Sequence, residues 1–457
     1  MRWALGVVFL LHVAITGWAA FHHEAWVDET DTWLLVRDAD VSTIVRVAAH
    51  RGAPLLFEAT LWPFARAGAP YFVQQLLNLV WVWLAVLLVL RARELPLLLR
   101  VLFPFSYYPA FEYAVNARPY GLQMLLTFAM AAAWQEREEK PIRLAVAIAL
   151  LANTTVHGLV TAAIAGLVLL LEQRRVSRQT VVMLLGGILA AAQLWPRGGP
   201  GRSPNIPQLE TVWYALSSAF FADARPGDAI VPALAVLALV TFAISRSWPA
   251  LLFFWSTAGA LMLINVFLWM GGLRHAGILL LVTVAAVWLA RAYGPWRGGL
   301  WVTGALAVAL TYSMFPAARA WDDEARYAYS GSRELAEFLR SSGLDRAELV
   351  AHPVPSFSSF LVYLPEKKLW YPAAEAYGTY PRWRLEDGKQ SRLPLAAALE
   401  RAETQLRGRR WVFVTVHRLP PELRERYRLL YETRTPVWRA HVERFRVYEP
   451  LVSRSGI

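Results

Sequence analysis

The sequence is dominated by long apolar segments that alternate with short polar ones. A membrane-spanning helix needs about 20 apolar residues, so segments of this length predict transmembrane helices. Only 18% of the 457 residues are charged, whereas soluble domains average about 25%. We therefore expect a polytopic α-helical membrane protein with about 11 transmembrane helices. The predicted spans are residues 3–21, 71–90, 95–113, 119–134, 142–156, 158–172, 180–196, 228–244, 248–270, 275–291 and 299–316.

Basic residues predict the orientation of these spans, because cytoplasmic loops are enriched in Lys and Arg. With a cytoplasmic N-terminus, the inner connections contain Arg91, Arg93, Arg137, Lys140, Arg143, Arg174, Arg175, Arg178, Arg246, Arg291 and Arg297. Nearly every inner connection is then basic. We expect this orientation, and an odd number of spans then places the C-terminal part outside the cytoplasm. The first span has no small-x-small cleavage site before His22, so we expect it to remain as an anchor.

Composition excludes several classes of function. A net charge of +12 would indicate nucleic-acid binding in a soluble domain. Here the loop arginines account for the charge, so we expect membrane lipids, and no nucleic acid, as partners. There are no cysteines, which excludes disulfides and thiolate catalysis.

Two regions lie outside the predicted spans. In the first outer loop, residues 22–70, the stretches 41–50 and 54–67 mix charges with apolar residues at helical spacing. Such stretches are too charged to span and predict helices in the membrane interface. From residue 317 the composition becomes that of a soluble protein. We therefore expect a transmembrane domain of residues 1–316 followed by a second domain, residues 317–457.

The second domain alternates helix and strand patterns. Residues 332–342 form an amphipathic pattern that stops at Gly343, and residues 394–406 begin with a proline suited to a first helical turn. Residues 348–352, 360–364 and 411–416 have strand patterns. The alternation predicts a small α/β domain, which the charge pattern places outside the cytoplasm.

Polar residues gather at the outer ends of the predicted spans. The acidic cluster Asp28-Glu29-Thr30-Asp31 follows the first span. Further polar residues come from distant loops and helix ends, yet the predicted topology places all of them at one membrane level: Glu112, Arg118, Tyr120, His157, Arg274 and His275. Charged groups held at a membrane are costly to desolvate and commonly mark function. We therefore interpret these residues as one candidate site.

The residue types suggest roles within this site. Asp28 and Glu29 are candidates for a general base and a supporting carboxylate, which act within hydrogen-bond reach of an acceptor. Arg118 precedes a proline that favours a chain break, and it is a candidate bidentate ligand for a phosphate. An interfacial arginine beside an anchoring Tyr120 has the same pattern, so both interpretations stay open.

A second anion-binding pattern begins the tenth predicted span, with the sequence Gly271-Gly272-Leu273-Arg274-His275. Glycines permit close backbone approach, a helix N-terminus favours anions, and Arg274 adds a positive charge. Arg274 and His275 are also consistent with an anchor at a helix end. His157 is also consistent with a polar residue in a helix turn that has no function.

A metal is a further candidate. His22, His23 and Glu24 lie together in sequence, although adjacent histidines rarely bind one ion without additional ligands. Carboxylates nearby suit a hard divalent cation, so Mg²⁺ or Mn²⁺ is the candidate cofactor.

Together these features resemble the GT-C glycosyltransferases. The features are an Asp-Glu pair in the first outer loop, amphipathic interfacial helices, an Arg-Pro-Tyr junction, many spans and a C-terminal outer domain. The similarity is greatest to bacterial members related to protein O-mannosyltransferases and lipid A aminoarabinose transferases. One departure is the sequence His50-Arg51-Gly52-Ala53-Pro54-Leu55, which is a degraded form of the family's His-Pro-Pro-Leu stretch.

The resemblance implies a function. In that family the donor is a sugar on a polyprenyl phosphate, and an acidic residue of the first loop activates the acceptor. Carried over, Asp28 is the base with Glu29 beside it, and Arg118 and Arg274 face the lipid phosphate. The implied reaction is an inverting single displacement onto a lipid, glycan or protein acceptor. It takes place at the outer face of the plasma membrane, the inner membrane of a bacterium.

Two other classes of function remain open. A transporter or flippase for lipid-linked glycans tends to place charges near the bilayer midplane and to show repeated halves. Here the charges gather at one surface and no repeat is visible. A non-catalytic assembly subunit for surface glycans would tolerate Asp28→Asn, whereas an enzyme would lose turnover.

Overall fold

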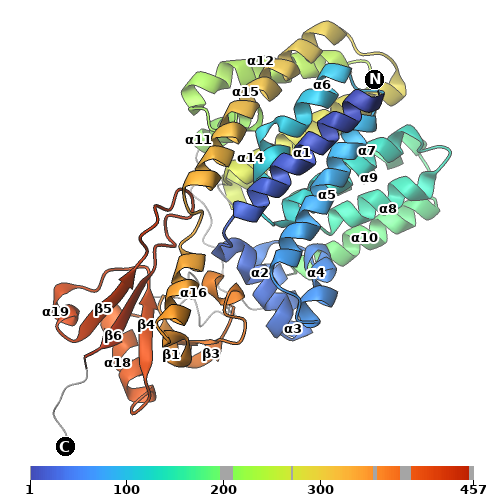
Figure 1. Ribbon diagram of the computed structural model, residues 1–457. Helices are drawn as coiled ribbons and strands as arrows, with labels where there is room; N and C mark the ends of the chain where they lie inside the picture. The colour runs from blue at the N-terminus through green and yellow to red at the C-terminus, as the bar shows by residue number, and fades with distance from the viewer. Residues whose placement is uncertain (1, 196–208, 269–270, 354–357, 381–392, 452–457) are drawn as a thin grey trace, which may run out of the picture.

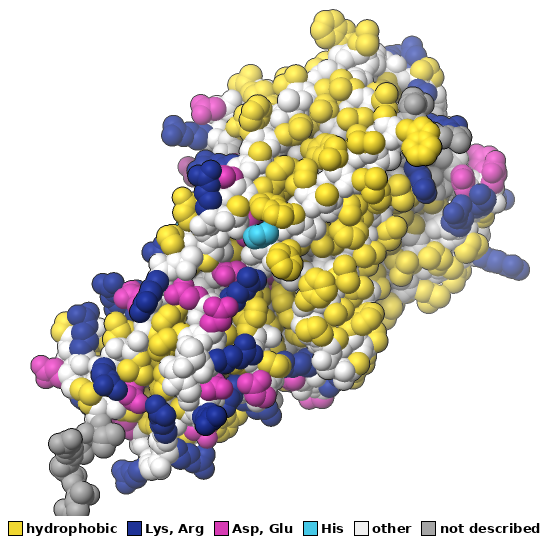
Figure 2. All heavy atoms as spheres, in the orientation of Figure 1, with side chains coloured by type: hydrophobic (Ala, Val, Ile, Leu, Met, Phe, Trp, Pro, Cys, Tyr) yellow, Lys and Arg dark blue, Asp and Glu magenta, His cyan; other side chains and the backbone are white. Residues whose placement is uncertain are grey.

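The computed structural model describes residues 2–195, 209–268, 271–353, 358–380 and 393–451. Long helices pack side by side in a bundle, and a small α/β domain lies at one end of it (Figure 1). The N-terminus lies at the far end of the bundle from that domain. One face of the bundle is covered by apolar side chains, whereas charged side chains are dense over the α/β domain (Figure 2).

Within the described residues, seven helical segments are long and apolar enough to cross a membrane. The segments contain α1 (Arg2–His22), α5 (Phe72–Arg91), α9 (Val156–Gln173), α12 (Pro226–Ile244), α13 (Trp248–Leu263) with its continuation η3 (Ile264–Leu268), α14 (Leu273–Ala290) and α15 (Gly299–Arg326). The expected helical membrane fold is confirmed. Helix α15 continues unbroken past residue 317, where the sequence composition changes.

The other four predicted spans are not among these seven segments. Three are helices: α7 (Pro119–Gln135), α8 (Pro141–Ala152) and α10 (Arg178–Leu194). The fourth, residues 95–113, is divided into α6 (Leu97–Leu102), η1 (Phe103–Phe105) and the π-helical turn η2 (Tyr108–Glu112). Pro104 and Pro109 lie in this stretch and lack the N–H groups that a continuous helix requires. A further helix, α11 (Leu209–Phe220), was not predicted.

Three short helices connect α1 to α5: α2 (Val27–Asp38), α3 (Val41–Arg51) and α4 (Leu56–Arg66). The latter two match the predicted amphipathic stretches. Helix α2 was not predicted, and Asp28 and Glu29 lie in its first turn. Carboxylates are favourable in that turn, where they interact with the positive end of the helix dipole.

The C-terminal domain contains a six-stranded mixed sheet in the order β3-β2-β1-β4-β6-β5. Its strands are β1 (Glu348–Ala351), β2 (Leu369–Tyr371), β3 (Ala376–Gly378), β4 (Trp411–Thr415), β5 (Tyr427–Glu432) and β6 (Arg446–Pro450). Its helices are α16 (Ser332–Ser341), η5 (Leu344–Arg346), η6 (Ser359–Val362), α18 (Leu395–Gln405) and α19 (Pro421–Arg424). β1 pairs in parallel with β2 and β4.

The predicted helices of this domain and two of its three predicted strands are present. The strand predicted at residues 360–364 is wrong, because Phe360 and Leu361 lie in the 3₁₀ turn η6. Both side chains are buried against the sheet core, and a short apolar run does not distinguish a buried turn from a buried strand.

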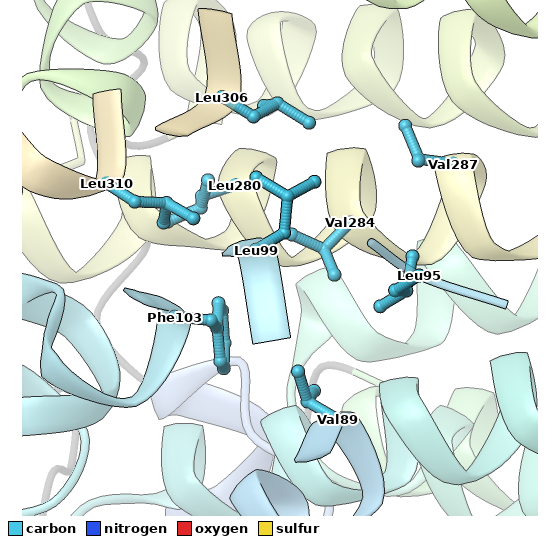
Figure 3. A pocket seen from close by; sticks show the side chains of 9 residues that line it. All are labelled: Val89, Leu95, Leu99, Phe103, Leu280, Val284, Val287, Leu306 and Leu310. Atoms are coloured by element: carbon cyan, nitrogen blue, oxygen red, sulfur yellow. The ribbon is translucent and has the colours of Figure 1, made fainter. Parts of the chain in front are cut away.

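The membrane part is closely packed far from the α/β domain. Figure 3 shows a cavity of about 10 Å³ between α5, α6, α14 and α15, lined by Val89, Leu95, Leu99, Phe103, Leu280, Val284, Val287, Leu306 and Leu310. A space of this size holds about one water molecule, and none of its lining side chains is polar. It is therefore a packing defect of the core and not a substrate site.

Candidate active site

A larger cavity lies where the N-terminal turns of α2, α7, α9 and α14 meet. Its volume is about 410 Å³, and residues from α3 and α4 complete its wall. Seven of the site residues predicted from sequence line it: Asp28, Asp31, Arg118, Tyr120, His157, Arg274 and His275. Glu29 and Glu112, which were also predicted, are not among the lining residues.

Asp28 is held between two arginines. Its Oδ2 accepts a hydrogen bond from Nη1 of Arg274 at 2.9 Å, and Nη1 of Arg118 donates to its backbone carbonyl. Burial raises the pKa of Asp28, but the charges of Arg118 and Arg274 outweigh this effect and hold the pKa below its usual range. The side chain is 39% exposed. Asp28 is therefore an ionised carboxylate at the cavity surface.

The two arginines are placed by different elements. Arg118 is the N-cap residue of α7, and its Nε is buried without a hydrogen-bond partner. Arg274 lies in the first turn of α14, with its guanidinium 5.2 Å from the ring centre of Trp26. Unsatisfied N–H groups and the dipole at a helix N-terminus attract anions. The N-terminal turns of α7, α9 and α14 line the cavity, and their dipoles and the two arginines make it suited to a phosphate.

The segment that carries Arg118 is irregular, and side chains of α5 satisfy its backbone. Nδ2 of Asn78 contacts the carbonyl oxygens of Tyr113, Ala114 and Asn116 at 2.8, 2.9 and 3.3 Å. Nε2 of Gln74 donates to the carbonyl of Ala117 at 2.9 Å. Irregular backbone at membrane depth requires such internal partners. These amides therefore fix the position of the arginine.

Glu29 also holds the Arg118 segment in place, and it does not line the cavity. It is 0% exposed, and its Oε1 accepts from the backbone N–H of Ala117. Its Oε2 accepts from the hydroxyl of Tyr71 at 3.0 Å and lies 3.2 Å from Nε2 of His23. The side chain is thus placed to hold the Arg118 segment against α2.

His23 is enclosed by two carboxylates. Its Nδ1 lies 2.8 Å from Oε1 of Glu324, on α15, and its Nε2 faces Glu29. Burial lowers the pKa of His23, but the two carboxylates raise it to about 10. A protonated His23 therefore links α1, α2 and α15 behind the cavity.

The three candidate metal ligands do not converge. His22 is exposed and its Nδ1 donates to the carbonyl of Trp18 at 2.9 Å, whereas His23 is committed to its two carboxylates. Among the residues that the structure describes, no group of three or more His, Cys, Asp or Glu is placed to hold a metal ion. The Mg²⁺ or Mn²⁺ cofactor therefore stays a prediction.

Glu112 joins the bundle to the C-terminal domain. Its Oε2 accepts from the hydroxyl of Tyr107 at 2.8 Å and from Nη2 of Arg439 at 3.1 Å. The carboxylate is buried and its partners are protein groups. We therefore assign it to domain docking.

The C-terminal domain also forms hydrogen bonds with α2 and with the residues just before it. Oε1 of the buried Glu443 accepts from the N–H of Val27 at 2.7 Å, and the hydroxyl of Ser358 donates to Oδ1 of Asp31. The hydroxyl of Tyr363 accepts from the N–H of Ala25 at 3.0 Å. Asp28 lies between these anchor points, so the domain helps to position the cavity's acidic wall.

Tyr120 and His275 form a pair whose tautomer is defined. Nδ1 of His275 accepts from the N–H of Gly272 at 2.9 Å, so the imidazole is neutral and its proton is on Nε2. Nε2 lies 2.9 Å from the hydroxyl oxygen of Tyr120 and donates to it. The hydroxyl hydrogen of Tyr120 is therefore free to be donated to a bound molecule. The His157 ring packs beside His275, with ring centres 5.2 Å apart.

Comparison with known proteins gives one structural similarity. No protein-family model matches the sequence, and no curated protein shows significant sequence similarity. The structure is similar to the crystal structure of ArnT from Cupriavidus metallidurans in the apo state, with a TM-score of 0.56. The match covers 97% of this chain and 98% of that chain at 12% sequence identity.

The chain has the ArnT fold. The similarity includes both the helical membrane part and the C-terminal α/β part, since nearly all of each chain is matched. The expected architecture, a helical membrane part followed by a small α/β part, is confirmed at this level.

Three lining residues with titratable or charged side chains were not predicted as site residues: His50, Arg51 and Glu58. The sequence contained a signal for Glu58. Phe57, Leu61 and Ala65 form the buried stripe of α4 at helical spacing, and Glu58 lies next to Phe57 on that buried face. A carboxylate at the edge of an apolar stripe is costly unless the protein uses it.

Proposed function

We propose that the protein is a membrane glycosyltransferase that moves a sugar from a polyprenyl-phosphate donor to an acceptor. The observation that carries the proposal is the pairing of Asp28 with Arg274 and Arg118 in one cavity, at the end of the bundle that faces the α/β domain. The similarity to ArnT supports the same class of reaction. In the proposed orientation this end faces outward and the N-terminus is cytoplasmic.

The geometry suits a single displacement. Arg118, Arg274 and the helix N-termini bind the donor phosphate and stabilise the charge that grows on it as the bond to the sugar breaks. Asp28 stays ionised, accepts a hydrogen bond from the acceptor group, and stabilises the positive charge that develops at the anomeric carbon. The acceptor enters from the face opposite the phosphate, so the anomeric configuration inverts.

The proposal is tested with the purified full chain and a panel of polyprenyl-phosphate sugars. We expect release of free polyprenyl phosphate from one class of donor in the presence of membrane lipid, glycan or peptide acceptors. Movement of the intact donor across a vesicle bilayer, without cleavage, would instead indicate a transporter. Absence of both would contradict the proposal.

Tyr120→Phe should weaken the reaction without unfolding the protein. The variant keeps the ring but loses the hydroxyl hydrogen that His275 leaves free for the phosphate. A hydrogen bond to a charged group contributes about 1.5–3 kcal/mol, so we expect a roughly 10- to 100-fold fall in kcat/KM for the donor. Tyr312→Phe, on the partly exposed face of α15, is the control and should retain wild-type kinetics. Equal kinetics of Tyr120→Phe and Tyr312→Phe would show that the Tyr120 hydroxyl does not take part in the reaction.

A further inference from the structure

Glu58 is a buried carboxylate that lines the polar cavity, and the proposed reaction does not yet give it a role. It is 4% exposed, and its Oε2 has no hydrogen-bond partner. It lines the polar cavity and also a second cavity of about 390 Å³ between α3 and α4, whose other lining residues are apolar. Glu58 therefore lies at the boundary between the two spaces.

The three carboxylates that line the polar cavity differ in their surroundings. Asp28 is paired with Arg274. Burial raises the pKa of Asp31 to about 6, but Asp31 accepts a hydrogen bond from Ser358 and lies 3.7 Å from Nη2 of Arg51. Burial raises the pKa of Glu58 to about 7, against smaller opposite effects from its own backbone N–H, Arg51 and Arg118. A proton acceptor works best when its pKa is near the working pH and it has a free lone pair. Asp28, with a lowered pKa, is a weaker base.

We propose that Glu58 accepts the proton of the acceptor group during sugar transfer. The inference rests on the proposed glycosyltransferase function. The acceptor's oxygen or nitrogen forms a bond to the anomeric carbon while the bond from that carbon to the phosphate oxygen breaks. The bonding electrons leave with the polyprenyl phosphate, and the acceptor's proton moves to Oε2 of Glu58. Asp28 orients the acceptor group and remains ionised throughout.

Other titratable or charged groups face the same cavity and define its electrostatic environment: Asp28 and Asp31 on α2, His50 and Arg51 on α3, Arg118 at the cap of α7, Tyr120 on α7, His157 on α9, and Arg274 and His275 on α14. His275 is neutral by its hydrogen bonds, and the arginines stay charged. The test therefore compares a change at Glu58 with a change at a glutamate outside the cavity.

The experiment is the pH profile of kcat/KM for sugar transfer, with any donor of the panel that the wild type uses. Wild-type kcat/KM should fall about tenfold per pH unit below about pH 7, as Glu58 becomes protonated. Glu58→Gln should lower the plateau about 10²- to 10⁴-fold and remove this acid limb. Glu58→Asp keeps a carboxylate and should retain the limb at a reduced rate.

Glu337→Gln is the control. Glu337 is an exposed carboxylate of α16 that does not line the cavity, and its variant should keep the wild-type profile. An active, folded Glu58→Gln variant with an unchanged acid limb would overturn the inference and leave the proposed function standing. A wild type that releases no polyprenyl phosphate from any donor would overturn both.

Discussion

Replacing Arg274 with glutamine should lower kcat for sugar transfer about 10²- to 10³-fold, the effect of losing one preorganised group that stabilises transition-state charge. Arg274 has its guanidinium beside Asp28 and Trp26 and lies in the first turn of α14. In the proposed reaction it binds the phosphate as negative charge grows. Kinetics with a donor of the panel measure the effect.

Product binding separates this role from a merely structural one. Arg274→Gln should weaken binding of polyprenyl phosphate roughly 10- to 100-fold, because one charge-assisted hydrogen bond is lost. Asp28→Asn should not weaken it, because it removes a negative charge from beside the phosphate. Arg319→Gln, whose side chain is 77% exposed on α15, serves as the control. Wild-type kcat and product affinity in Arg274→Gln would contradict the proposed phosphate site.

Replacing His23 with alanine should destabilise the protein by about 3–5 kcal/mol, the usual cost of removing one partner from a buried ion pair. The change leaves Glu29 and Glu324 buried without their shared cation. It should also loosen the Arg118 segment that Glu29 holds. Thermal unfolding in detergent, followed by tryptophan fluorescence, measures the effect. His22→Ala is the matched control, because His22 is exposed one residue earlier and should have little effect.

The sign of the pH dependence follows from the direction of the shift. The pKa of His23 is raised from about 6.5 in the unfolded chain to about 10 in the folded one. Its stabilising contribution is therefore complete below about pH 6.5, decreases as pH rises, and is lost above about pH 10. The difference in melting temperature between wild type and His23→Ala should shrink over that range. A constant difference would show that His23 acts by packing alone.

Much of the site was predictable because membrane topology restricts which helix ends can meet. Arg118 and Arg274 are more than 150 residues apart, yet both begin helices that start at the same end of the bundle as α2. Alternating basic loops predict this arrangement, and the structure brings both arginines to Asp28. The local sequences could not show that the two arginines contact the same residue.

Other features depend on partners that are distant in the sequence. Glu29 was expected to assist Asp28, but in a helix adjacent residues point about 100° apart, so Glu29 faces α5 and His23 instead. His23 meets Glu324 across 301 residues. Helix α2 itself was missed because its acidic first turn conceals the apolar run that follows. No local pattern contains these tertiary contacts.

The most direct test of the central claim is release of polyprenyl phosphate by the wild type and by Asp28→Asn, compared at equal donor occupancy. Asp322→Asn, which changes an exposed aspartate of α15, controls for loss of charge alone. The proposal predicts release by the wild type and by Asp322→Asn, and release reduced to background in a folded Asp28→Asn variant. Equal release by all three proteins would show that this cavity does not carry out the transfer.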